Sequence, residues 1–124
     1  MTTNHRSLQT SSTTLPTSSG DRDFEIDFDT PNLSTTTSTH ARPFLSYRVN
    51  PGSDAGVHVL VELNGTEIVD QTIDTTVSRQ FDEIFDHGVL RSGTGGANTL
   101  RVFVPNNEPG SVTVSDLIVV YPEA

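Results

Sequence analysis

The chain has 124 residues, with sixteen acidic residues against seven basic ones, a net charge of −9 and no cysteine. This length predicts one domain, and the lack of cysteine excludes disulfides and thiolate metal sites. No basic patch is available to contact phosphates, so binding to nucleic acid is not expected.

Two polar tracts dominate the first forty residues. Residues 1–20 are rich in Ser and Thr and cannot bury enough apolar surface to fold alone. Phe24, Ile26 and Phe28 then alternate with acidic residues, which predicts a half-buried strand over about 23–29. We therefore predict a polar N-terminal arm over 1–40 and a compact body over 41–124. The strand of the arm pairs either at an edge of the body near the C-terminal strand, or on a neighbouring subunit. In the second case Phe24, Ile26 and Phe28 would form an interface.

A hairpin centred on Asn64-Gly65 is the strongest local signal. Asn and Gly tolerate positive φ, and such a pair between alternating apolar runs predicts a type I′ turn. With a two-residue loop Val61 faces Ile68, so one face carries the set Val57, Val59, Val61, Leu63 and Ile68. The opposite face carries His58, Leu60 and Val69, which we predict to contact the arm or a partner.

The rest of the body reads mainly as strands. Residues 44–49, 98–104 and 111–121 alternate in hydrophobicity, and the second half of the last segment is apolar on both sides, which predicts a central strand. Between the hairpin and the glycine-rich loop 91–97, apolar residues Val77, Phe81, Ile84 and Phe85 recur at helical spacing. They predict a single helical turn or an irregular crossover.

These elements predict an all-β fold, an antiparallel β-sandwich. The pieces Val59-Leu-Val-Glu-Leu-Asn-Gly65, Leu90-Arg-Ser-Gly93, Asn98-Thr-Leu-Arg-Val-Phe-Val104 and Val114-Ser-Asp-Leu-Ile-Val-Val-Tyr121 resemble galactose-binding-like jelly rolls over about residues 44–121. The resemblance implies a jelly-roll module of the kind attached to many glycoside hydrolases. Such modules are often non-catalytic and variously bind glycans, bind calcium or act as spacers. The chain has no Trp, which argues against a large platform for stacking sugars.

Acidic residues suggest metal sites only weakly. Asp82, Asp86 and His87, with Glu83, are spaced to share one side of a helical turn and are candidate metal ligands. In a chain this acidic, a solvated face is the favoured interpretation. Asp27, Asp29 and Asp116 are candidates for a calcium site of the kind that the resemblance implies. We predict no cofactor.

No segment indicates catalysis. The four histidines are scattered, no nucleophile elbow is present, and no carboxylate pair stands out as a glycosidase pair. We therefore predict that the protein is not an enzyme. A metal-dependent hydrolase is retained only as the last alternative.

An acidic, lysine-free chain rich in Thr and Val also resembles proteins of salt-loving archaea and their viruses. Molar salt shortens the Debye length to about 3 Å and screens a dense carboxylate surface. We predict a structural or assembly protein, a small virion component that contacts other protein subunits, with a glycan-binding or adhesion module as the alternative. The first residues lack an apolar signal region and no run spans a membrane, which predicts a location in the virion or cytoplasm.

Overall fold

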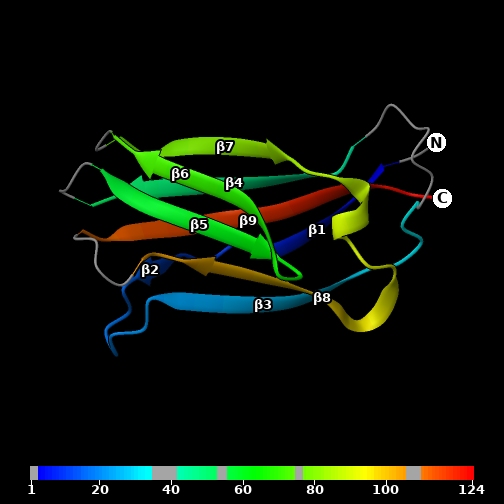
Figure 1. Cartoon of the computed structure of the whole chain (residues 1–124), viewed down its shortest axis with the longest axis horizontal. Helices are drawn as coiled ribbons and strands as arrows, with labels where there is room; N and C mark the ends of the chain where they lie inside the picture. Colours follow the sequence, from blue (N-terminus) through cyan, green and yellow to red (C-terminus); the bar gives the residue numbers. More distant parts are fainter. Residues whose placement is uncertain (1–2, 35–41, 53–55, 75–76, 106–109) are drawn as a thin grey trace.

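The computed structural model describes residues 3–34, 42–52, 56–74, 77–105 and 110–124, which form a sandwich of two antiparallel sheets (Figure 1). In chain order the elements are β1 (Thr3–Gln9), β2 (Thr13–Leu15), β3 (Asp23–Thr30), β4 (Phe44–Pro51), β5 (Val57–Leu63), β6 (Thr66–Ile73), β7 (Arg79–Ile84), the 3₁₀ helix η1 (His87–Val89), β8 (Gly93–Phe103) and β9 (Val112–Pro122). Sheet A has the order β1-β9-β4-β7, with β2 also paired to β9, and sheet B has the order β3-β8-β5-β6. The predicted all-β antiparallel sandwich is confirmed. Among the described residues, no helix has the length and apolarity that crossing a membrane requires.

The predicted hairpin is confirmed, with one change of register. Asn64 and Gly65 both have positive φ, of 52° and 82°, and Leu63 pairs with Thr66 as a two-residue turn requires. A bulge then follows, so that Val61 faces Val69 instead of Ile68. Val69 is 3% exposed and lies in the core, which corrects its predicted position on the outer face.

A second bulge reverses the alternation in β9. Asp116 has a φ of 53°, a left-handed conformation that Asp tolerates better than most residues, and the pairing with β4 shifts at this point. Val114 before the bulge and Leu117 after it are both buried, at 1% and 0% exposed. The bulge therefore makes Leu117, and not Ile118, continue the inward face of Val112 and Val114. β9 lies between β1 and β4, so the predicted central strand is confirmed.

The N-terminal segment belongs to the sandwich. β1 pairs with β9 from Thr3↔Pro122 onward, β2 pairs with the same strand, and β3 pairs with β8. The predicted division into an arm over 1–40 and a body over 41–124 is therefore wrong for the described residues 3–34. β3 lies at an edge, as one of the two placements had it, but it pairs with β8 and not with the C-terminal strand, which the residues just after β3 contact instead. Backbone pairing with an exposed edge does not need apolar side chains, and fully buried Leu15 anchors the segment.

The segment expected to be helical contains a strand. β7 pairs with β4, placing Ile84 beside Phe44 and Phe81 beside Tyr47, with the last two rings stacked at a centroid distance of 5.5 Å. A spacing of four residues also keeps side chains on one face of a strand, so the pattern did not distinguish the two structures. Phe85, just after β7, is buried in the core.

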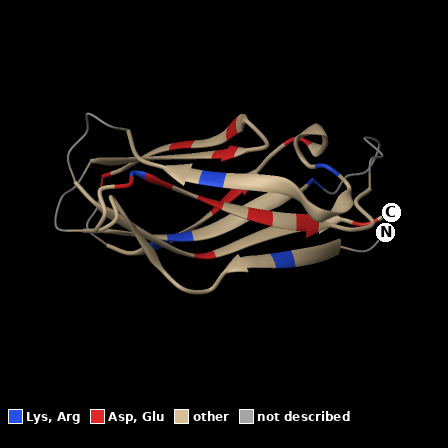
Figure 2. Cartoon of the chain, turned by 90° about the horizontal axis from the view of Figure 1, so that it is seen from below, with Lys and Arg blue, Asp and Glu red and all other residues tan. Residues whose placement is uncertain are grey.

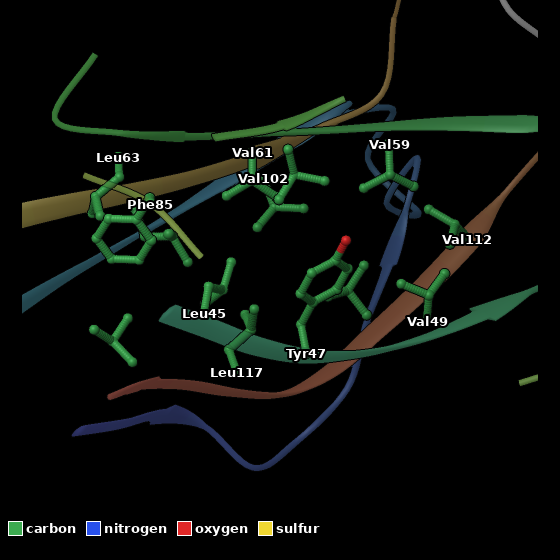
Figure 3. Packing of buried hydrophobic residues seen from close by; sticks show 14 of the residues in the cluster. Leu45, Tyr47, Val49, Val59, Val61, Leu63, Phe85, Val102, Val112 and Leu117 are labelled. Carbon is green, nitrogen blue, oxygen red and sulfur yellow. The ribbon is translucent and has the colours of Figure 1, made fainter. Parts of the chain in front are cut away.

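The core lies between the two sheets. Figure 3 shows side chains of sheet A, among them Leu45, Tyr47 and Leu117, pointing toward Val61 and Val102 of sheet B. Burial raises the pKa of Tyr47, and the nearby carboxylate of Glu83 adds to this shift. Apolar side chains therefore fill the space between the sheets, and polar chemistry is confined to their outer faces and ends.

Candidate functional site

The outer face of sheet B combines apolar and charged side chains. Along β8, Leu100 and Val102 are buried, whereas Arg101 and Phe103 between and after them face outward and are half-buried. The strand register places Phe103 between Asp23 of β3 and Leu60 of β5. The same register places Arg101 between Glu25 and Glu62. Three strands therefore bring an aromatic ring, a guanidinium and several carboxylates to one surface.

Arg101 is held in a defined position on this surface. Its Nε donates to Asp23 Oδ2 at 2.9 Å, its Nη1 lies 3.7 Å from Glu62 Oε2, and its Cζ lies 4.2 Å from the centroid of the Phe103 ring. The hydrogen bond to Asp23 raises the pKa of Arg101 further above its usual value. The side chains of Arg101, Asp23 and Glu62 are 37%, 42% and 32% exposed, so all three remain accessible to a ligand.

An open pocket of about 420 Å³ adjoins this cluster. It is lined by Gly20, Asp21, Arg22, Asp23, Arg101, Phe103, Val104 and Pro105. Arg22 fixes one wall, because its Nη2 and Nε donate to the Pro105 carbonyl at 2.6 and 3.0 Å. The volume lies within the range of small-molecule sites. We call the side chains of Asp23, Leu60, Glu62, Arg101 and Phe103, together with this pocket, the sheet B site.

The charge around the sheet B site is mostly negative. The strand register places four further acidic residues on the same outer face, Glu25 and Asp27 of β3 and Glu67 and Asp70 of β6. Figure 2 shows acidic positions distributed along the strands, with few basic positions between them. A surface of this kind repels polyanions and admits neutral or cationic ligands.

The six residues predicted as an interface divide into two groups. Phe24 and Ile26 pack against the core of their own chain, and Phe28 and Val69 are buried within it. His58 and Leu60 lie on the outer face of sheet B, where His58 Nε2 is hydrogen-bonded to Asp70 Oδ1 and Leu60 lies beside Phe103. Contact of these residues with another subunit stays a prediction.

The structure does not bring the candidate metal ligands together. Asp82 lies in β7, Asp86 follows that strand and His87 begins η1, so the shared helical side on which the prediction depended does not exist. Within the described ranges, no group of three or more His, Asp or Glu side chains could hold a metal ion.

The carboxylates considered for calcium bind partners within the chain. Asp27 accepts a hydrogen bond from the Thr99 hydroxyl at 2.7 Å, and Asp29 accepts from the backbone N–H groups of Gly96 and Ala97. Asp116 belongs to β9 in the opposite sheet. The three side chains therefore do not fit a common calcium site.

The hydrogen bonds to Asp29 predict a pH-dependent contribution to stability. Backbone hydrogen bonds from Gly96 first of all, then from Ala97 and Gly95 in the first part of β8, together with the charge of Arg6, lower the pKa of Asp29 below its usual 3.8. A lowered pKa in the folded state stabilises the fold above the unfolded pKa, and this contribution is lost as the pH falls through the folded value. We expect Asp29→Asn to lower the urea midpoint at pH 7 and to differ less from the wild type near pH 3. An equal difference at both pH values would contradict this.

Sequence reasoning placed Leu60 on an outer face but did not identify Asp23, Glu62 and Arg101 as residues of the site. The alternation of Thr99, Arg101 and Phe103 with buried residues does show that Arg101 and Phe103 share a face. Asp23 and Glu62 join them only through the pairing of β8 with β3 and β5, which links strands far apart in the sequence.

Comparison with solved structures shows similar sandwiches in carbohydrate-binding modules. The CBM36-1 domain of a multidomain xylanase from the hindgut metagenome of Trinervitermes trinervoides superposes with a TM-score of 0.52 at 9% identity, covering 99% of each chain. The C-terminal CBM6 of LamC, a marine laminarinase from Zobellia galactanivorans, gives 0.47 at 11% identity, covering 98% of this chain and 100% of that one. A CBM36 in complex with calcium and xylotriose gives 0.41 at 12% identity, over 95% and 98% of the two chains.

These modules are galactose-binding-like β-sandwich domains, so the fold expected from the sequence resemblance is confirmed at the level of architecture. No protein-family model matches the chain, and no curated protein is significantly similar to it. At such low identity the likeness establishes the fold alone.

Proposed function

We propose that this chain is a carbohydrate-binding module that holds a neutral glycan at the sheet B site. The observation that carries the proposal is the cluster of Arg101, Asp23 and Glu62 around the Phe103 ring, beside an open pocket of about 420 Å³. The fold, which the chain shares with a carbohydrate-binding module, is compatible with this function.

The chemistry of the cluster suits sugar hydroxyls. A hydroxyl group donates to a carboxylate and accepts from a guanidinium, so Asp23 and Glu62 on one side and Arg101 on the other offer both kinds of partner. The half-buried ring of Phe103 supplies an apolar surface for the C–H groups of a sugar ring, and the buried side chain of Leu60 lies beside it. Since Arg101 already stacks on Phe103, the free aromatic surface is small, and we expect weak binding.

The surrounding carboxylates define the ligand class. Glu25, Asp27, Glu67 and Asp70 repel uronic acids and sulfated sugars, whereas a neutral oligosaccharide has no charge to oppose them. We therefore expect neutral oligosaccharides to bind and polygalacturonate not to bind.

The virion-component hypothesis from the sequence receives less support. It relied on the acidic, lysine-free composition and on an arm that contacts neighbouring subunits, but four of the six predicted interface residues pack within their own chain. The hydrolase alternative has no support from the described residues, because the carboxylates of the sheet B site are engaged with Arg101.

Calorimetric titration with neutral oligosaccharides tests the proposal. We expect Phe103→Ala to weaken binding by about tenfold, equivalent to about 1.4 kcal/mol, because the apolar support of the ligand and of Arg101 is lost. The matched control is Phe44→Ala, since Phe44 is also a half-buried Phe but lies on the outer face of sheet A.

Two results would contradict the proposal. One is the absence of saturable binding to any neutral oligosaccharide in the panel. The other is equal binding by Phe103→Ala and the wild type when both are shown by circular dichroism to be folded.

A further inference from the structure

The outer face of sheet A has an apolar row across the sheet. In the strand register Ile84 of β7 lies beside Phe44 of β4, Phe44 lies beside Val120 of β9, and Val120 lies beside His5 of β1. Ile118 occupies the next outward position on β9. Ile84 is 64% exposed, and Phe44, Ile118 and Val120 are half-buried. We call Phe44, Ile84, Ile118 and Val120 the sheet A patch.

Charge is distributed unequally between the two outer faces. Around the sheet A patch the described strands place Ser, Thr, Asn and Gln, with Arg48 and Asp82 as the outward-facing charged residues of β4 and β7 and Asp116 at the bulge of β9. Arg79 and Glu83 of β7 pair with buried Val49 and Leu45 and so lie on the inward side of that strand. The outer face of sheet B instead carries acidic residues on β3, β5 and β6. For a chain with a net charge of −9, sheet A is therefore the face through which a second copy approaches with least repulsion.

We propose that the sheet A patch binds a second copy of this chain, face to face, as a symmetric pair. A two-fold axis that runs in the interface between β4 and β9 places Val120 of one copy against Phe44 of the other. The same axis places Asp82 against Ser7 and Arg48 against Ser115, because these residues occupy the same rows on either side of the axis. No like charges then face each other, and both acidic sheet B faces point outward.

The size of the face indicates a weak pair. Four strands about 4.8 Å apart and about seven residues long form a face of about 450 Å² on each copy. The total lies below the usual size of stable interfaces, in the range of transient ones. Each copy carries a charge of −9, so screening by salt strengthens the pairing.

Sedimentation velocity from about 10 µM to about 1 mM protein tests the proposal. At about 1 M NaCl we expect the mass to rise with concentration toward twice the 13.4 kDa of the chain, and at about 0.1 M NaCl to rise less. Ile84→Asp, at an exposed position that folding does not need, should raise the dimer dissociation constant at least tenfold, and Phe44→Ala should raise it as well. Phe103→Ala, the matched control on sheet B, should leave it unchanged.

A chain that stays monomeric at all protein and salt concentrations would overturn the proposal. So would a dimer that Ile84→Asp leaves intact, or one that Phe103→Ala disrupts, since either result would place the contact elsewhere.

Discussion

Replacing Asn98 with alanine is expected to destabilise the fold by about 2–4 kcal/mol. Asn98 is fully buried, and its side chain makes hydrogen bonds with three other residues. Its Oδ1 accepts from Arg91 N at 2.8 Å and Asn64 Nδ2 at 2.9 Å, and its Nδ2 donates to Arg91 O at 2.9 Å and Thr30 Oγ1 at 3.1 Å. Alanine removes these four hydrogen bonds, each of which contributes about 0.5–1.5 kcal/mol net, and deprives the Arg91 N–H of its bond to Oδ1. Thr30 Oγ1 still donates to Arg91 O, and Asn64 Nδ2 still donates to Val89 O, so the loss stays within the expected range.

Urea denaturation at pH 7 measures this effect. Thr99→Ala is the control, because Thr99 is the next residue along β8 and its hydroxyl donates to the exposed carboxylate of Asp27. We expect this control to lose less than about 1 kcal/mol. Equal losses for the two variants would show that the buried hydrogen bonds of Asn98 contribute no more than a surface contact does.

Leu117→Ala is expected to destabilise the fold by about 2–5 kcal/mol, and Ile118→Ala by about 1 kcal/mol or less. Leu117 is fully buried in the core, whereas its neighbour Ile118 lies on the outer face of sheet A and is half-buried. Truncating a buried leucine loses apolar burial and leaves a cavity. The bulge at Asp116 is the reason why Leu117 is buried and Ile118 faces outward. Uninterrupted alternation from Val112 and Val114 would bury Ile118 instead.

The two variants are compared by urea denaturation under the same conditions. A larger loss for Ile118→Ala than for Leu117→Ala would contradict the bulge and restore uninterrupted alternation through β9. Similar losses for the two would contradict the difference in burial.

The hairpin shows which part of the fold is predictable from local sequence. Asn64 and Gly65 specify their turn through backbone conformations that they adopt easily, and the four apolar residues of β5 predicted to face inward are buried. The bulges near Ile68 and at Asp116 were not predicted. An inserted residue moves every later side chain of the strand to the opposite face of the sheet. Where apolar residues occur on both faces, the sequence pattern does not show this change.

Edge strands were predicted least well. β1 and β2 consist largely of polar residues, and they join sheet A through backbone hydrogen bonds to β9 that no side-chain pattern reports. β7 carries a four-residue spacing that suits both a helix and a strand. In the same way, Arg101 and Phe103 could be placed on one face from the alternation in β8, but Asp23 and Glu62 required the order of strands in sheet B.

The most direct test of the central claim is a titration of isotope-labelled protein with a neutral oligosaccharide, followed by NMR of the backbone amides. Binding at the sheet B site predicts saturable shifts at residues 21–25, 58–62 and 99–105, with residues 44–48 and 118–120 of sheet A unaffected. Shifts confined to sheet A, or no saturable shift with any neutral oligosaccharide, would contradict the assignment of this face as the glycan-binding site.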